Sequence, residues 1–174
     1  MATKKLMRVL FGILVISAWV LGSAIQAGAE TMNFKFYTYA TQTEKFPVND
    51  VEEHVVMYQL RGTFYVFQNG EVATASLVAT GDLIKGAGPF MNYNTIKFAD
   101  GSTIIIKSQG TIGGTASGAP ASGGWTSELI KGTGRFEGIK GTLNAKVKYL
   151  PLEKGEAGPK GYGEGTITYT LPSK

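Results

Sequence analysis

KGTGRFEGIKGT, residues Lys131–Thr142, places four glycines within twelve residues. A dinucleotide-binding loop needs G-x-G-x-x-G between a strand and a helix, so that the N-terminus of the helix meets the phosphates. Residues 132–138 instead read G-x-G-x-x-x-G, and a strand pattern follows in place of a helix. The stretch therefore predicts a tight turn between two strands, with Phe136 and Ile139 closing one end of the core.

Apolar and polar side chains alternate on both sides of this turn and elsewhere in the chain. The alternation in residues 32–40, 141–149 and 161–171 is typical of half-buried antiparallel strands. Asn-Gly at 69–70 and Asp-Gly at 100–101 each separate two strand-like segments, which predicts hairpins with type I′ turns. Eight strands are expected, near residues 32–40, 55–68, 71–80, 92–98, 102–112, 124–131, 141–149 and 161–171.

Eight strands without a crossover helix predict an all-β fold, most economically a closed antiparallel barrel, since closure removes the exposed edges. A two-sheet sandwich is the competing architecture. In a barrel, the more apolar face of each strand is expected to point inward. The side chains expected inside are Phe34, Phe36, Val56, Tyr58, Leu60, Phe64, Val66, Ala73, Ala75, Leu77, Ile104, Ile106, Trp125, Ser127, Leu129, Leu143, Val147, Tyr149, Tyr169 and Leu171.

The N-terminal residues have the order of a secretory signal peptide. Lys4, Lys5 and Arg8 precede an uncharged apolar run, Val9–Leu21, and Ala27–Ala29 offers an A-x-A cleavage site. An uncleaved membrane anchor is the alternative, but the apolar run is shorter than the roughly 20 residues of a spanning helix. We therefore expect an exported protein, periplasmic or secreted, that is free of the membrane after cleavage.

Cleavage after Ala29 divides the chain into a signal peptide, 1–29, and a single barrel domain, 30–174. Removing 29 residues from 174 leaves 145, with 14 basic and 13 acidic side chains. This near-neutral balance gives no electrostatic reason to expect nucleic-acid binding. The chain has no cysteine, which excludes disulfides, thiol catalysis and thiolate metal sites.

Few residues offer catalytic or metal chemistry. His54 is the only histidine, so a hydrolytic triad would have to use it, and no serine lies near it in sequence. We interpret His54 as a solvated surface residue in an acidic loop or single turn, residues 45–54. A zinc site needs more histidines or cysteines, and the acidic residues lack the spacing of a calcium loop. No metal or cofactor is expected.

Residues Gly132–Val147, GTGRFEGIKGTLNAKV, resemble the G-G-[ST]-G-x-F-x-G-x-x-G motif of allene oxide cyclases and dirigent proteins. The similarity extends over about Gln59–Val147 and marks the chain as resembling a bacterial exported member of that superfamily. The resemblance implies an eight-stranded antiparallel barrel, often trimeric, with a largely apolar central cavity.

The resemblance transfers no catalytic residue. The plant cyclases carry a carboxylate on the first strand, but residues 32–40 contain no acidic side chain and Glu44 lies beyond them. Glu71 and Asp82 lie near strand ends, where dirigent proteins carry cavity aspartates, without a secure match. The segment Gly113–Gly124 departs from the family pattern and is expected to be either a lid over the barrel mouth or a long hairpin connection.

These observations favour an exported barrel that binds a small apolar molecule in its interior, because almost none of the expected inward residues ionises near neutral pH. An allene oxide cyclase-like isomerase or a dirigent-like protein is the alternative, and an isomerase predicts a carboxylate or a paired Tyr/Asn set in the cavity. A structural or oligomeric interaction domain is the second alternative, supported by the outward positions expected for Val55, Met57, Tyr65 and Phe67. The proposed ligand-binding side chains are Tyr58, Phe64, Trp125, Tyr149 and Tyr169.

Overall fold

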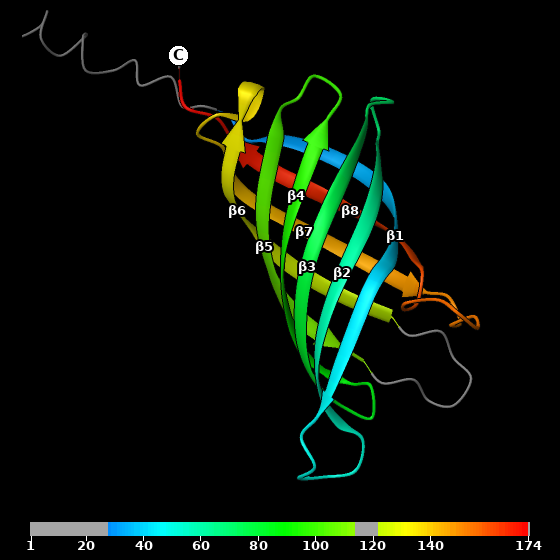
Figure 1. Cartoon of the computed structure of the whole chain (residues 1–174). Coiled ribbons are helices and arrows are strands. Elements are labelled where there is room, and N and C mark those ends of the chain that lie inside the picture. Colours follow the sequence, from blue (N-terminus) through cyan, green and yellow to red (C-terminus); the bar gives the residue numbers. More distant parts are fainter. Residues whose placement is uncertain (1–27, 114–121, 174) are drawn as a thin grey trace, which may run out of the picture. The chain divides into compact units, whose positions relative to one another are not determined.

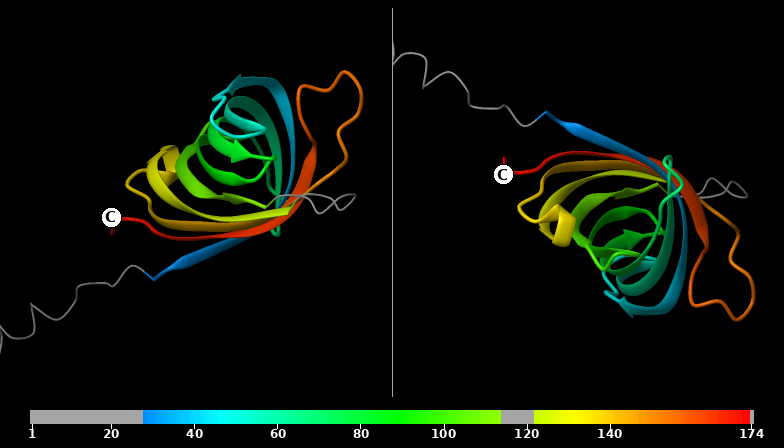
Figure 2. Two further views of the ribbon diagram at one scale, coloured as in Figure 1. Left: turned by 90° about the horizontal axis from the view of Figure 1, so that it is seen from below. Right: turned by 90° about the horizontal axis from the view of Figure 1, so that it is seen from above.

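The computed structural model describes residues 28–113 and 122–173, and within them the chain forms one closed barrel of eight antiparallel strands (Figures 1 and 2). Each strand pairs with its neighbours in sequence, and β1 closes the ring by pairing with β8. The elements are β1 (Glu30–Pro47), β2 (His54–Phe67), β3 (Val72–Ile84), β4 (Gly88–Phe98), β5 (Thr103–Ile112), β6 (Ser122–Thr133), the 3-10 turn η1 (Gly134–Phe136), β7 (Lys140–Tyr149) and β8 (Gly161–Thr170).

The predicted all-β barrel of eight strands is confirmed, and the sandwich alternative is wrong because the hydrogen-bonded ring closes. The predicted signal peptide and the possible lid fall largely outside the described residues, and the domain boundary at residue 30 stays a prediction. Among residues 28–113 and 122–173, no helix combines the length and apolar character needed to cross a membrane.

The first strand is longer than its alternation predicts. β1 runs to Pro47, whereas the pattern suggested an end near residue 40. A register shift between Ala40 and Gln42 interrupts the period of two, and beyond it β1 continues to pair with β2 as far as Pro47 opposite Val55. Because of the bulge, the alternation does not predict the second half of the strand. The loop between β1 and β2 is therefore shorter than expected and comprises residues 48–53.

Both glycine hairpins form, but with a different turn from the one predicted. The Phe67 N–H donates to the Glu71 carbonyl at 2.8 Å, and the Phe98 N–H donates to the Ser102 carbonyl at 3.0 Å, so each loop has three residues. Gly70 and Gly101 both have φ of 84°, whereas no positive φ occurs at the residue before either glycine. This is the three-residue loop with a left-handed glycine, not a two-residue type I′ turn.

The glycine stretch between β6 and β7 closes one end of the barrel, as predicted. Gly134 and Gly138 have φ of 62° and 74°, values that fold the chain tightly around η1. This turn directs Phe136 and Ile139 into the core, where they are 3% and 4% exposed. The turns β2–β3 and β4–β5 lie at the same end in Figure 1, and we call it the closed end. The opposite end, with loops 48–53, 85–87 and 150–160, is called the mouth.

Candidate functional site

The closed end is filled by aromatic side chains. The rings of Phe98 and Phe136 lie 4.9 Å apart between centroids, and Phe136 contacts Tyr169 edge-on at 6.1 Å. The Tyr169 hydroxyl donates to the Glu30 carboxylate at 2.7 Å. The Arg135 guanidinium lies 4.7 Å from the centroids of both phenylalanine rings and covers them from outside. This end is packed core rather than a binding site.

The interior toward the mouth is polar and contains a small cavity, which we call the interior pocket. Its volume is about 60 Å³. Apolar lining comes from Phe36, Met57, Leu77, Phe90, Trp125 and Tyr149, among others. The polar lining residues are Thr38 of β1, Gln59, Arg61 and Thr63 of β2, Asn92 and Asn94 of β4, and Ser108 of β5. Within the described parts of the chain, no aspartate or glutamate lines the pocket.

Arg61 is the central polar group of the pocket and is only 7% exposed. Its Nε donates to Thr38 Oγ1 at 3.1 Å, its Nη1 to Gln59 Oε1 at 2.8 Å, and its Nη2 to the Pro159 carbonyl at 2.7 Å. The guanidinium carbon also lies 5.5 Å from the centroid of the Tyr149 ring. All of these partners are neutral.

Burial lowers the pKa of Arg61, and the Tyr149 hydroxyl opposes that shift. An arginine starts from so high a pKa that its side chain stays protonated in proteins. Burial likewise raises the pKa of Tyr149, while the Arg61 charge lowers it. The pocket therefore carries one permanent positive charge beside a neutral phenol.

A second polar group links β2 and β4. Asn94 Nδ2 donates to the Tyr65 hydroxyl at 2.9 Å, and both side chains are buried. Burial raises the pKa of Tyr65 far above its ordinary value, so the phenol stays protonated. The side-chain oxygens of Asn92 and Asn94 are buried and accept no hydrogen bond from any described residue. Unsatisfied buried acceptors are rare in proteins, and each one needs an explanation.

The loop between β7 and β8 covers one side of the pocket. Pro159 accepts the Arg61 hydrogen bond, and a Cβ at Gly158 would lie 2.8 Å from Gln59 Nε2. Within this loop, Glu156 forms an ion pair with Lys160, and the Leu150 N–H donates to the Lys160 carbonyl at 2.8 Å. The Arg61–Pro159 bond holds the loop against β2 and places neutral backbone next to the arginine, whereas the other two contacts lie within the loop.

The structure places the five predicted ligand-binding side chains in three different environments. Trp125 and Tyr149 line the interior pocket. Tyr169 points inward but belongs to the packed closed end. The interior placement of Tyr58 and Phe64 is wrong: Phe64 is 53% exposed, and Tyr58 lies between the pocket residues Met57 and Gln59, so it faces outward.

The error concerns the whole of β2, whose two faces are exchanged relative to the prediction. Val56, Leu60 and Val66, expected inside, lie on the outer face with Tyr58 and Phe64. Met57, Tyr65 and Phe67, expected outside, are 8%, 5% and 3% exposed and point inward. A shift of one residue reverses every side chain of a strand. The inner face was misassigned because it carries Gln59, Arg61 and Thr63, which a purely apolar criterion places outside.

Sequence reasoning therefore missed the polar half of the pocket. The sequence of Met57–Phe67 does indicate this polar half. On one face of the strand, large apolar residues lie at both ends and three polar residues lie between them. Asn92 and Asn94 alternate with Ile96 and Phe98 in the same way on β4. Departures from the local rule such as these polar stretches are expected at functional or strained sites.

His54 is not the solvated residue that the sequence suggested. Its side chain is 13% exposed, with Nδ1 2.5 Å from Asp50 Oδ1 and Nε2 2.6 Å from Asp82 Oδ1. The hydrogen bond with Asp82, and then that with Asp50, raises the pKa of His54. The cluster ties loop 48–53 to the end of β3 at the mouth. It contains no nucleophile, so we interpret it as a structural tie.

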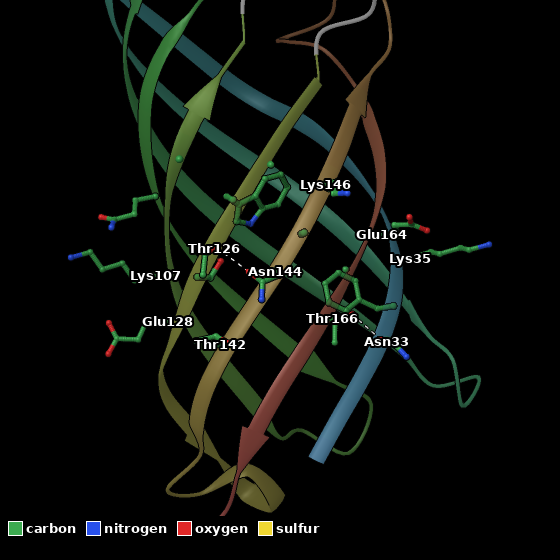
Figure 3. Close-up of a pocket in the computed structure, with 18 of the residues that line it drawn as sticks. Asn33, Lys35, Lys107, Thr126, Glu128, Thr142, Asn144, Lys146, Glu164 and Thr166 are labelled. Carbon is green, nitrogen blue, oxygen red and sulfur yellow. Dashed lines mark hydrogen bonds between the residues drawn. The ribbon is translucent and has the colours of Figure 1, made fainter. Parts of the chain in front are cut away.

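A larger depression lies over β5, β6, β7, β8, β1 and the end of β2 (Figure 3). Its volume is about 1470 Å³, but it is open to solvent and lined by exposed Thr, Asn, Lys and Glu side chains. Several of these already bond across strands: Thr126 donates to Asn144 at 2.9 Å, and Thr166 donates to Asn33 at 2.8 Å. The interior pocket is the better candidate because its polar groups are buried and partly unpaired.

The outer face also carries aromatic residues near the depression. Tyr162 of β8 lies opposite Tyr37 of β1, which lies opposite Phe64 of β2, and the three are 51%, 40% and 53% exposed. Tyr39 stacks on Tyr37 at 6.2 Å between ring centroids. The outward stripe predicted on β2 is wrong, so the interaction-domain alternative rests on these side chains instead. A trimer stays a prediction.

Within the described residues, no group of three or more His, Asp or Glu side chains is arranged to hold a metal ion.

The comparisons with known proteins concern the fold. No protein-family model and no curated protein matches the chain. Two of the solved structures that it matches are pterocarpan synthase dirigent proteins. One is 15% identical, with 84% of this chain and 97% of that chain covered and a TM-score of 0.47. The other is 13% identical, with 84% and 88% covered and a TM-score of 0.49. At these values the likeness is one of barrel fold alone.

Proposed function

We propose that this protein binds a small molecule in the interior pocket and holds it without covalent chemistry. The single observation that supports the proposal is the group of buried polar side chains at the mouth, among them two asparagine oxygens without hydrogen-bond partners in the described chain. A core built only for stability would place apolar side chains there, as the closed end does. A ligand group that donates hydrogen bonds would satisfy the two oxygens, and a ligand group that accepts them would bind the polar donors of the pocket.

The volume of the pocket limits how the ligand binds. Drug-sized ligands occupy pockets of roughly 300–1,000 Å³, whereas this one has about 60 Å³. It accommodates a polar group of a few heavy atoms, and the remainder of the molecule would extend toward the mouth past Phe90, Trp125 and Tyr149. The ligand is therefore proposed to be amphipathic, in place of the wholly apolar molecule expected from the sequence.

The proposal includes export. The signal-peptide pattern of residues 1–29 supports a periplasmic or secreted protein. Removal of that segment would also remove Trp19 and leave Trp125 as the only tryptophan of residues 30–174. Because Trp125 lines the pocket, the fluorescence of the processed protein reports on pocket occupancy.

The test titrates the processed protein with hexanoate, hexanamide and hexan-1-ol and follows Trp125 fluorescence and heat of binding. Ala79→Leu adds three carbons to a pocket-lining residue that is 7% exposed, and should abolish binding. Val78→Leu is the matched control, because Val78 is the neighbouring residue on the outer face and 45% exposed. Binding that survives Ala79→Leu, or the absence of binding for every probe, would reject the interior site.

An isomerase is the second candidate, supported by the Tyr65–Asn94 pair that such a function predicts. The protonated Tyr65 hydroxyl and the Arg61 charge would together stabilise negative charge developing on a substrate oxygen. Incubation with an unsaturated epoxide and chiral chromatography test this idea: one enantiomer should be in excess, and Tyr65→Phe should remove the excess. A racemic product, the same as in buffer, would reject the isomerase.

A further inference from the structure

The positive charge of Arg61 has no acidic partner among residues 28–113 and 122–173. All thirteen Asp and Glu residues lie within the described parts of the chain, and none has a carboxylate oxygen within 4.0 Å of the guanidinium. Residues 114–121, which follow β5 in sequence, read GTASGAPA and contain no acid. Among the described residues, no acidic side chain therefore forms an ion pair with this charge.

A buried charge is ordinarily paired with an opposite charge, because removing it from water is unfavourable. The Arg61 side chain is only 7% exposed. Within the described chain, three neutral oxygens accept its hydrogen bonds. The guanidinium has five N–H groups, and these three bonds use one each on Nε, Nη1 and Nη2. The second N–H of Nη1 and of Nη2 remains for a further acceptor.

Other groups of the pocket complement an acid with an apolar body. Asn92, 6% exposed, and Ser108 line the same cavity as Arg61, and their amide nitrogen and hydroxyl can donate to a carboxylate. A carboxylate only accepts hydrogen bonds, so it would pair with these donors and Arg61 and not with the Asn92 and Asn94 oxygens. The apolar surfaces of Phe90 and Trp125 line the remaining part. The volume of about 60 Å³ suits the three heavy atoms of a carboxylate, and a planar carboxylate matches the fork of a guanidinium.

We propose that the ligand carries a carboxylate and binds through an ion pair between that carboxylate and Arg61. The inference rests on the proposed function, since it names the chemical class of the molecule held in the interior pocket. The ligand class is a monocarboxylic acid whose apolar portion lies against Phe90 and Trp125. In the ligand-free protein, the polar oxygens of Thr38, Gln59 and Pro159 hold the guanidinium in place for it.

A purely structural role for Arg61 is the competing explanation. Through Pro159 the side chain ties the β7–β8 loop to β2, and this tie would exist without any ligand. The two roles differ in what they predict for ligand charge. If Arg61 is only structural, the protein should bind an anionic and a neutral probe of the same size and shape with equal affinity. If Arg61 is an anion site, the protein should bind the anionic probe more tightly.

The experiment compares hexanoate with hexanamide, its neutral counterpart of nearly equal shape, by Trp125 fluorescence and calorimetry on the processed protein. The wild type should bind hexanoate about 10- to 100-fold more tightly than hexanamide, the range expected for one charge-assisted contact. Arg61→Gln should abolish that preference while keeping hexanamide binding, and Arg61→Lys should retain part of it. Lys97→Gln removes the same charge from the exposed outer face of β4 and should change neither affinity.

The outcomes separate the two proposals. Equal affinity of the wild type for hexanoate and hexanamide overturns the anion site and leaves the binding pocket standing, and this result needs no variant to fold. A preference for hexanoate that persists in Arg61→Gln but disappears in Lys97→Gln shows that surface charge causes the preference. This result also overturns the anion site at Arg61. Failure of both probes to bind removes the proposed function together with this inference.

Discussion

Asn92 offers the sharpest test of whether the polar interior exists for a ligand or for stability. Its side chain is 6% exposed, lines the interior pocket and has an oxygen that no described residue meets with a hydrogen-bond donor. Leucine has nearly the same shape and favours strand structure more than asparagine does. Asn92→Leu should therefore stabilise the ligand-free protein while weakening binding.

The magnitude follows from the unsatisfied oxygen. A buried acceptor without a partner destabilises a protein by about 1–3 kcal/mol, and removing it returns most of that free energy. Allowing for the packing of two new methyl groups, the free energy of unfolding should rise by about 1–2 kcal/mol. In a domain of this size that corresponds to an increase of roughly 3–6 °C in Tm. Such an inverse relation between stability and binding is typical of residues retained for function.

The assay is urea unfolding of the processed wild-type and variant proteins, which should share one m-value and differ in midpoint. Ser108→Ala is the matched control, because Ser108 is 1% exposed and bonds to Ser127 at 2.6 Å. Breaking this satisfied pair leaves one hydroxyl unpaired and should destabilise the protein by about 1 kcal/mol. If Asn92→Leu lowers the midpoint as Ser108→Ala does, Asn92 is a structural residue and the reasoning fails.

Two further predictions concern the barrel wall and the mouth. A Cβ at Gly165 would lie 2.5 Å from the Phe34 ring and 2.6 Å from the Asn144 carbonyl, so Gly165→Ala should destabilise by about 1–3 kcal/mol in urea unfolding; an unchanged midpoint would contradict the close packing. Because the folded-state pKa of His54 is raised above 6.5, its stabilising effect is complete below that pH and disappears as pH rises through the folded-state pKa. The Tm difference between wild type and His54→Gln should therefore shrink from pH 6 to pH 9, whereas parallel profiles would show that the Asp50–His54–Asp82 cluster does not titrate.

The sequence predicts the architecture and the closed end well because both depend on local rules. The glycine turn of residues 131–142 needs left-handed backbone at Gly134 and Gly138, which few other residues adopt. Phe136 and Ile139 enter the core for the same reason, since the turn leaves them no other direction. Strict alternation in β7 and β8 likewise identifies their inner faces, where the buried side chains are apolar throughout.

The site is less predictable because it violates the rule by which faces are assigned. On β2 the pocket requires Gln59, Arg61 and Thr63 to point inward, while Phe64 and Val66 are exposed on the outer face. A criterion based on apolarity then selects the wrong face. The bulge in β1 adds a second difficulty, because it interrupts the alternation that would have set the register between the two strands.

The two ends of the barrel divide stability and binding between them. Ile96, Ile104 and Ile167, each 0% exposed, belong to the same hydrophobic core as Phe136 of the closed end. Burial of such residues is the main source of folding free energy, so the mouth is free to keep polar groups that do not stabilise the fold. A guanidinium without an acidic partner in the described chain and two unsatisfied amide oxygens are tolerable only when the rest of the core compensates for them. The packed glycine-turn end is therefore what allows Arg61 to remain available, and weakening that end should lower stability without changing which ligand the mouth selects.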